Sequence, residues 1–344
     1  MTIGSTLKLA LAAGTAAVLV AATGASAQTL TKVKYGTNWV AQAEHGGYYQ
    51  AVADGTYKAC GLDVTIVPGG PQANNRMLLP TGGIDFYMGG NMLQAFSAVE
   101  QSIPTIVVAA TFQKEPQVLI AHPDQGIEKF EDLKKLSTIF VGKEGLATFY
   151  QWMKAEFGFK EEQTKPYTFS AAPFLVDKKS AMQGYLTSEP YGIEKEAGFK
   201  PKIFLLADHG FDTYSTTIET RKDLVEKSPK VVECFVNGSA LGWVNYLYGD
   251  NKAANELIKK DNPEMTDAAI AYSIAALKEY GIVDSGDAIA KGIGAMSDAR
   301  QKSFFDKMVK AGVVKAGVDY TKSYTLAFVN KGVGLDVKKK LTGN

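Results

Sequence analysis

IDFYMGGNMLQAFSAVEQSIPTIVVAATF, residues 84–112, is the stretch whose order of patterns decides the fold class. The apolar run from Ile84 to Met88 predicts a buried strand that ends at Gly89-Gly90. Asn91 is typical of a helix start, and Thr105 to Phe112 is β-branched and apolar like a central strand. A strand–helix–strand order predicts a parallel sheet covered by helices, the α/β class.

The same alternation extends on both sides of this stretch. Upstream, we expect strands at 31–36 and 62–67, with helices at 46–58 and 74–79. The pattern starts again near Pro116, where the expected elements are a strand at 118–121, a helix at 127–135, a strand at 138–141, a helix at 146–157, a strand at 166–169, a helix at 171–183 and strands from 202 and at 213–218. Long helices are then expected at 222–248, 252–260, 267–279 and 298–311.

Two α/β patterns without a flexible linker predict two lobes with mainly parallel sheets. Residues 28–115 and 205–344 are expected to build one lobe, and residues 116–204 the other. Short strands that cross between the lobes would act as a hinge.

Residues 1–27 have the pattern of a secretory signal peptide. Lys8 is followed by an apolar run from Leu9 to Ala22 and by Ala25-Ser26-Ala27. The run is shorter than the roughly 20 apolar residues that a membrane span needs, and it ends in an A-x-A cleavage site. We therefore expect export to the periplasm with cleavage after Ala27.

The charge balance excludes some partners. The chain has 37 Lys plus Arg against 36 Asp plus Glu. Lys8 is the one charged residue of the signal, so residues 28–344 carry no net charge. A neutral chain gives no electrostatic case for nucleic acid as a partner, and we expect a monomer. The two cysteines, Cys60 and Cys234, are compatible with a disulfide in an oxidising compartment or with two buried free thiols.

Motifs of common enzymes are absent from the sequence. There is no phosphate-binding G-x-x-x-x-G-K-[ST] loop, no H-E-x-x-H and no G-x-S-x-G. The three histidines, His45, His122 and His209, are too scattered to indicate a metal site. We expect no catalytic residues, no metal and no cofactor.

Polar and aromatic residues instead follow the predicted strands. Open α/β sheets bind ligands at the carboxyl ends of their strands. The candidate ligand-binding residues of the first lobe are Asn38, Trp39, His45, Tyr87, Gly90, Asn91, Phe112 and Gln113. Those of the second lobe and the return to the first are Tyr150, Glu189, Tyr191 and Tyr214.

Each candidate has a plainer interpretation. Trp39 either stacks on a flat ligand or fills the core, and His45 either offers a hydrogen bond or starts a helix. Asn91 can cap a helix and still contact a ligand. Glu189, in a Glu-Pro segment expected after a helix, either accepts hydrogen bonds from a ligand or forms a salt bridge. Phe112, with Gln113, either lines the cleft or packs at the hinge.

Several of these segments, in this order, resemble the periplasmic binding proteins of importers for sulfonates, nitrate and thiamin pyrimidine precursors. The resemblance rests on Asn38-Trp39, His45 to Ala51, Asp85 to Gly90, Ser180 to Pro190 and Tyr214 to Thr217. The opening and the Glu-Pro segment are most similar to the branch that binds formylaminopyrimidine, hydroxymethylpyrimidine or riboflavin-like rings.

The resemblance implies a type II periplasmic-binding fold that closes on a ring held between aromatic side chains, without chemistry on the ligand. The protein would deliver an aromatic or heterocyclic small molecule to the permease of an ABC importer. The alternatives are a receptor for an aromatic carboxylate, a sulfonate or nitrate, an enzyme like the fungal pyrimidine synthases, and a sensor subunit. Two departures bear on them: a cysteine-rich synthase signature is missing, and Lys143 to Leu146 lacks a Ser/Thr-rich anion loop.

Overall fold

The computed structural model describes residues 1–4, 29–70 and 73–343. The expected signal peptide and its cleavage site after Ala27 fall almost entirely on residues 5–28, outside the described part. No helix within the described ranges is long and apolar enough to span a membrane.

The first sheet is built from five strands in the order β2-β1-β3-β10-β4. These strands are β1 Thr31–Gly36, β2 Leu62–Val67, β3 Phe86–Asn91, β4 Thr105–Phe112 and β10 Ser215–Arg221. β1 pairs in parallel with β2 and β3, whereas β10 is antiparallel to both β3 and β4. Four strands therefore run in one direction, and the strand that returns from the other sheet runs against them.

The second sheet repeats this plan in the order β7-β6-β8-β5-β9. Its strands are β5 Gln117–Ala121, β6 Thr138–Val141, β7 Thr164–Pro166, β8 Ser180–Tyr185 and β9 Lys202–Leu205. Here β5 is the strand that runs against its neighbours β8 and β9. The α/β class with two mainly parallel sheets is confirmed, each sheet being mixed by one strand.

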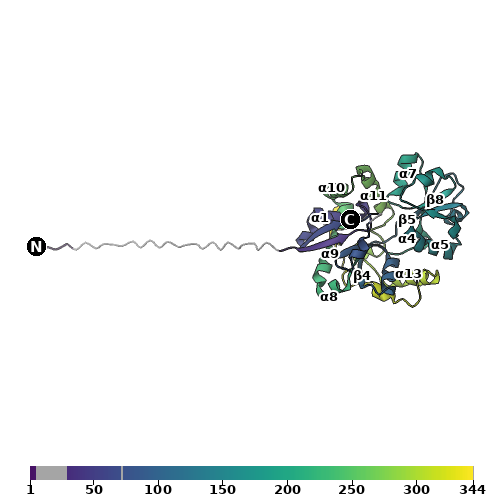
Figure 1. Cartoon of the computed structure of the whole chain (residues 1–344). Helices are drawn as coiled ribbons and strands as arrows, with labels where there is room; N and C mark the ends of the chain where they lie inside the picture. The colour runs from purple at the N-terminus through teal and green to yellow at the C-terminus, as the bar shows by residue number, and fades with distance from the viewer. Residues whose placement is uncertain (5–28, 71–72, 344) are drawn as a thin grey trace.

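Helices surround both sheets (Figure 1). With the first sheet go η1 Ala43–His45, α1 Gly46–Ala53, α2 Thr56–Ala59, η2 Asn75–Leu78, α3 Met92–Glu100, α8 Lys222–Lys227, α9 Pro229–Tyr248, α10 Lys252–Asp261, α11 Asp267–Glu279, α12 Ala288–Lys291, α13 Asp298–Lys310, η6 Tyr320–Ser323 and α14 Leu335–Thr342. With the second go η3 Phe130–Lys135, α4 Lys143–Ala147, α5 Phe149–Phe157, η4 Glu161–Gln163, α6 Ala172–Val176 and α7 Glu189–Ala197. We call the first sheet and its helices the first unit, and residues 117–205 the second unit.

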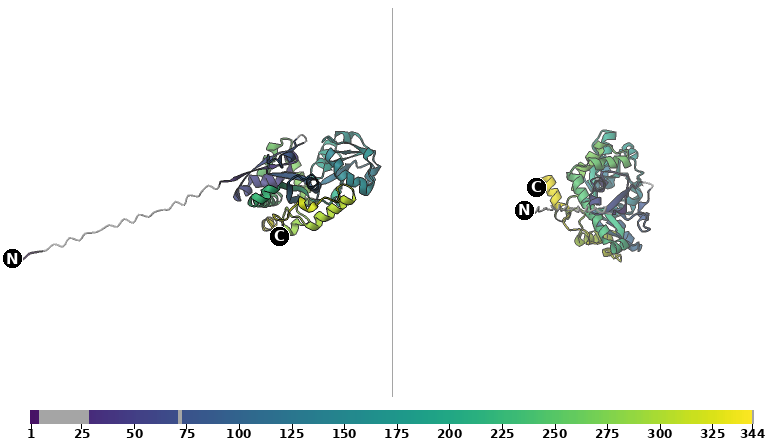
Figure 2. Two further views of the ribbon diagram at one scale, coloured as in Figure 1. Left: turned by 60° about the horizontal axis from the view of Figure 1, so that its bottom comes forward. Right: turned by 90° about the vertical axis from the view of Figure 1, so that its left-hand side faces the viewer.

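The chain passes between the units twice, through residues 113–116 and 206–214, the latter beginning with η5 Leu206–His209. Arg300 on α13 holds both crossing segments, because its guanidinium donates to the carbonyl oxygens of Gln113 and Asp212. Lys114 and Asp208 link the two segments by a salt bridge of 3.6 Å. The yellow end of the chain, which includes α13, lies along both units in Figure 2.

The close packing of α1 on α9 explains the two glycines after His45. A Cβ on Gly46 would lie 2.0 Å from the ring of Tyr246, and one on Gly47 would lie 2.2 Å from the indole of Trp243. Since real side chains never approach so closely, only glycine lets the two helices meet here. The His45-Gly46-Gly47 segment therefore has a packing role that holds η1 at the edge of the first unit.

A disulfide joins Cys60 to Cys234 and ties the end of α2 to α9, with a Cα–Cα distance of 5.8 Å. Of the two alternatives open at the sequence level, free thiols are thus excluded.

Several expected elements were wrong in detail. The helix expected at 171–183 is α6 followed by strand β8, because pairing with β5 and β6 overrides the helix propensity of Ala181-Met182-Gln183. Glu189 consequently follows a strand and begins α7, rather than following a helix. The helix expected at 46–58 breaks at Gly55, whose φ of 79° ends α1, and the one at 222–248 breaks at Ser228.

Candidate functional site

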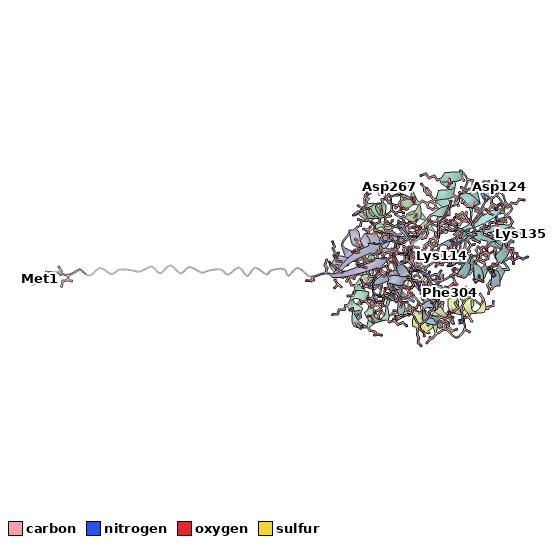
Figure 3. The ribbon with its side chains drawn as sticks, in the orientation of Figure 1. Met1, Lys114, Asp124, Lys135, Asp267 and Phe304 are labelled. Carbon is pink, nitrogen blue, oxygen red and sulfur yellow. A yellow bond between two sulfur atoms is a disulfide. The ribbon has the colours of Figure 1, made fainter. Side chains whose placement is uncertain are left out.

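Side chains that follow strands of the two units contact each other near the crossing segments, where Lys114 is labelled in Figure 3. Trp39 follows β1 of the first unit, and Phe169 follows β7 of the second. Their rings contact each other across the units, with centroids 4.8 Å apart. Phe169 has a φ of 63°, an uncommon backbone for a bulky residue, and its side chain is half exposed. An aromatic pair therefore closes one end of the interface.

Glu189 lies next to this pair and is held by donors of its own unit. Its carboxylate accepts from the Tyr185 amide at 2.7 Å, the Ser188 hydroxyl at 2.5 Å and the Tyr167 hydroxyl at 3.4 Å. Because Glu189 stands at the first turn of α7, the partial positive charge of the helix start also favours its negative charge. Glu189 is therefore a satisfied carboxylate.

Glu115 is a second carboxyl group, in the first crossing segment. It is 2 % exposed, and its Oε1 accepts from the Tyr185 hydroxyl at 3.1 Å. Oε2 has no hydrogen-bond partner. Burial raises the pKa of Glu115 to about 7, the hydroxyls of Ser215 and Tyr185 lower it, and the Glu144 charge raises it again.

The carboxyl end of β3 lies beside Glu115. The Ser215 hydroxyl donates to the Gly90 carbonyl at 2.7 Å. On the neighbouring Gly89, a Cβ would lie 2.3 Å from both Thr217 Oγ1 and Glu219 Oε1. Neither of these buried oxygen atoms has a partner. The glycines thus let polar atoms of β10 reach the end of β3.

Arg76 brings a positive charge to this place. It forms a salt bridge of 3.3 Å with Glu219, and its guanidinium carbon lies 5.8 Å from the centre of the Tyr87 ring. It also donates to Gln94 Oε1 at 2.5 Å, and Gln94 donates in turn to Glu144 of the second unit. This chain of contacts links the two units, and Glu144 is exposed at its outer end.

A third buried carboxyl, Glu44, meets the second unit at Thr187, whose hydroxyl donates to it. Its other oxygen is unpartnered, and burial raises the pKa of Glu44 to about 7. The adjacent His45 is buried with an unpartnered Nδ1, and burial lowers its pKa to about 3. His45 is therefore a neutral ring at physiological pH.

Of the residues predicted from sequence, the structure brings some to this interface. Trp39 contacts Phe169, which packs on Tyr167. The Tyr167 hydroxyl donates in turn to Glu189. Tyr87 lies by the guanidinium of Arg76, and the Gly90 amide donates to Gln94. Asn38 is half-buried beside Trp39. Asn91 caps α3 by accepting from the Leu93 amide at 3.0 Å, as expected for a cap.

Other predicted residues lie elsewhere. Phe112 is fully buried and packs on Trp243, and Gln113 donates to the carbonyls of Ala110 and Ala295. Tyr150 is fully buried in the second unit, where its hydroxyl donates to the Lys160 carbonyl.

The last two predicted tyrosines pack against side chains of the first unit. Tyr191 packs on Tyr272 of α11 at 5.2 Å between ring centres. Tyr214 donates to Asp287 and lies 4.0 Å below Arg300 at the second crossing segment. The rings of Phe112 and Tyr150 pack in cores and that of Tyr191 packs on Tyr272 of α11, and the expected sandwich of these rings with Trp39 around a ligand stays a prediction.

Sequence reasoning missed several residues of the interface, which are Arg76, Gln94, Glu115, Tyr167, Phe169, Tyr185, Thr217 and Glu219. Phe169 carried a usable signal, since it ends the predicted strand 166–169. Arg76 and Gln94 carried none, because they lie on short helical segments whose positions depend on the tertiary fold. Among the described residues, no group of three or more His, Cys, Asp or Glu side chains could hold a metal ion.

Several known proteins are similar to this chain in sequence or in structure. The chain is 25% identical over 330 residues to the riboflavin-binding protein RibY of Chloroflexus aurantiacus, covering 92% of both chains. Its structure is similar to a periplasmic sulfonate-binding protein SsuA of Methylobacillus flagellatus, with a TM-score of 0.59, 14% identity and coverage of 92% and 96%. It is also similar to the desulfurization enzyme DszB, with a TM-score of 0.59, 13% identity and coverage of 89% and 99%.

Two five-stranded mixed sheets whose strand ends meet between two units define the periplasmic-binding-protein fold. Residues 42–253 match the family model described as NMT1/THI5 like. The chain belongs to the NMT1/THI5-like family.

Proposed function

We propose that the protein is the periplasmic solute-binding component of an ABC importer and binds an aromatic or heterocyclic small molecule between its two units. The observation that carries this proposal is the Trp39–Phe169 pair, which closes the interface beside buried polar groups without partners. Aromatic faces hold a flat ring, and unpartnered carboxyl, hydroxyl and imidazole groups read its edges.

The two units would act as lobes, with residues 28–115 and 205–344 in one and 116–204 in the other. A ligand held by both lobes favours the closed arrangement because only there does it make all its contacts. Arg300, by holding both crossing segments, would set the axis of closure. The permease would then recognise the closed protein, which we expect to be a monomer.

The ligand class follows from the aromatic pair and from the family. The Trp39 and Phe169 rings contact each other at 4.8 Å between centroids and 46° between planes, so a pyrimidine precursor of thiamin or a flavin-like ring would part them as the units open and stack on the freed faces. The chain is similar to a riboflavin-binding protein over 92% of its length, and this similarity supports a heterocyclic ligand. Export by the expected signal peptide, with cleavage after Ala27, would bring the receptor to the periplasm.

A sulfonate or another anion is the second candidate, favoured by the structural similarity to SsuA. The described interface offers it little. Arg76 is already paired with Glu219, and the buried carboxyl groups of Glu44 and Glu115 each keep one oxygen without a hydrogen-bond partner. Like charges in a buried site oppose an anion.

An enzyme acting on a heterocycle is a candidate of another class, because the fold is shared with DszB. Incubation of the protein with a bound ligand distinguishes a receptor from an enzyme. A receptor returns the ligand unaltered, whereas an enzyme forms product.

A thermal-shift screen of pyrimidines, flavins and aromatic carboxylates tests the proposed function. A ligand present at 100 times its Kd should raise the free energy of unfolding by about 2.7 kcal/mol. Trp39→Ala should weaken binding by about tenfold or more, since a stacked aromatic is worth about 1–3 kcal/mol. Tyr280→Ala, which removes a partly exposed ring elsewhere, is the control. No shift with any compound, or equal affinity in Trp39→Ala, would refute the proposal.

A further inference from the structure

Carboxyl groups outnumber cations where the two units meet. Glu115 and Glu219 are buried there, and Glu144 stands exposed at the rim. Arg76 is paired with Glu219, which leaves Glu115 and Glu144 without a basic partner among the described hydrogen bonds and salt bridges. The Glu144 charge is one of the causes that raise the pKa of Glu115, so a positive charge beside both groups would stabilise the ionised form of Glu115.

Two buried polar atoms near the carboxyl end of β3 have no hydrogen-bond partner. Glu115 Oε2 is buried without a partner although Oε1 is hydrogen-bonded to Tyr185 of the opposite unit. The Thr217 hydroxyl, fully buried on β10 two residues beyond Ser215, is also unpartnered. Burying polar atoms without partners costs about 1–3 kcal/mol each, so such a cluster is typical of a site that a ligand completes.

We propose that the ligand carries a positively charged nitrogen, and that this group binds between Glu115 and Glu144 beside Tyr185 and the Gly90 end of β3. This inference rests on the proposed function and names the chemical class of its ligand. The ring would lie toward Trp39 and Phe169, and the ammonium or amidinium group toward Glu115. At Gly90 a Cβ would lie 3.4 Å from Gln94 Nε2 and 3.5 Å from Glu144 Oε1, so these polar groups stand directly beside the glycine and a larger side chain there would displace them.

The electrostatics of the site agree with a cation. A positive charge next to Glu115 stabilises its carboxylate form, so that binding at pH 7 should release a proton. The titratable groups facing Glu115 are Glu144 on α4 and Tyr185 on β8. The Tyr185 phenol would not release that proton, since burial raises its pKa well above its usual range.

Two matched pairs of probes test the inference on protein freed of ligand by unfolding and refolding. One pair is a pyrimidine with an aminomethyl group and its hydroxymethyl counterpart, and the other is benzyltrimethylammonium and benzyl alcohol. Tetramethylammonium serves as a cation without a ring. We expect the cationic member of at least one pair to bind about tenfold or more tightly than its neutral partner, which is the scale of one close charge contact.

Single substitutions test which carboxyl group causes the preference for the cationic probe. Glu115→Gln keeps the size of the side chain and should abolish the preference for the cation, together with proton release measured by calorimetry in two buffers. Glu144→Gln, on the exposed rim, should reduce the preference and does not depend on a buried group for folding. Glu128→Gln, which removes an exposed carboxylate paired with Lys202 on the second unit, should leave the preference intact.

The outcomes separate the two proposals. Neutral rings that bind as tightly as their cationic partners overturn the cation inference while the proposed function stands. Tetramethylammonium binding as tightly as benzyltrimethylammonium, with dependence on Glu115, supports the cation site and removes the aromatic ligand. A preference that survives both Glu115→Gln and Glu144→Gln, or no binding of any cation, overturns the inference.

Discussion

The two units differ in whether their buried polar side chains all have hydrogen-bond partners. Buried side-chain atoms without a partner occur in the first unit and its crossing segment, among them those of Glu44, Glu115 and Glu219. In the described part of the chain, none occurs between residues 117 and 205. There, Glu189 accepts three hydrogen bonds from its own unit.

This difference indicates a division of labour. A unit with unsatisfied buried groups gives up stability that a ligand can restore, whereas a satisfied unit can serve as a cover. The first unit also contains the disulfide, which offsets the cost of those groups by constraining the unfolded chain. Within this account, the first unit reads the ligand and the second closes over it.

Removing the disulfide should have the largest effect on this comparison. Replacing both Cys60 and Cys234 by Ser opens a link between residues separated by 174 positions. Chain entropy predicts a loss of about 5 kcal/mol for so long a loop. Denaturant unfolding followed by hydrogen exchange should show the loss in α2 and α9, with little change in β5 to β9. An equal loss of hydrogen-exchange protection in both units would contradict a division of roles between them.

The two glutamates should respond oppositely to loss of charge. Because the pKa of folded Glu115 is about 7 against the usual 4.5, the folded state holds more protons between these pH values. The free energy of unfolding therefore falls as pH rises through this window. Glu115→Gln should stabilise the protein at pH 8 by up to about 3 kcal/mol, and the gain should fade toward pH 5.

Glu189→Gln should instead destabilise at pH 8 by about 1–3 kcal/mol, because it weakens charge-assisted hydrogen bonds at the start of α7. Urea unfolding of both variants at pH 5 and pH 8 measures the contrast. Glu115→Gln losing stability at pH 8 would show that its carboxylate is already satisfied.

Two glycine substitutions give a smaller contrast. Gly89→Ala places a Cβ 2.3 Å from Thr217 Oγ1 and Glu219 Oε1 in the first unit, and should cost about 2 kcal/mol. Gly192→Ala on α7 meets nothing within 4 Å and should stabilise the helix by up to about 1 kcal/mol. Thermal unfolding measures both variants. A neutral Gly89→Ala would contradict the close contact of Gly89 with Thr217 and Glu219.

Periodicity and turn residues were enough to predict the α/β class and most elements, since alternating strands and helices leave few other arrangements. They failed at Ser180–Tyr185, where helix-forming residues are held as a strand by β5 and β6 on either side. The two antiparallel strands were also missed, because nothing in the composition of β5 or β10 records the direction in which a strand enters its sheet.

The ligand-binding residues stay predictions, and only their places in the fold can be compared with the sequence. Trp39 and Glu189 were expected near strand ends because each closely follows a strand, and Gly90 because it lies at the end of β3. Phe112 and Tyr150 are buried in cores, since an aromatic residue near a strand end is as suited to a core as to a ligand. Arg76, Gln94 and Glu144 become neighbours only through tertiary packing, which brings η2, α3 and α4 together.

Hydrogen–deuterium exchange with and without a ligand found in the screen tests most directly whether the ligand binds between the units. The account predicts protection on both sides at once, in residues 89–94 of the first unit and in residues 185–189 of the second. Protection confined to one unit, or located away from these strand ends, would contradict it.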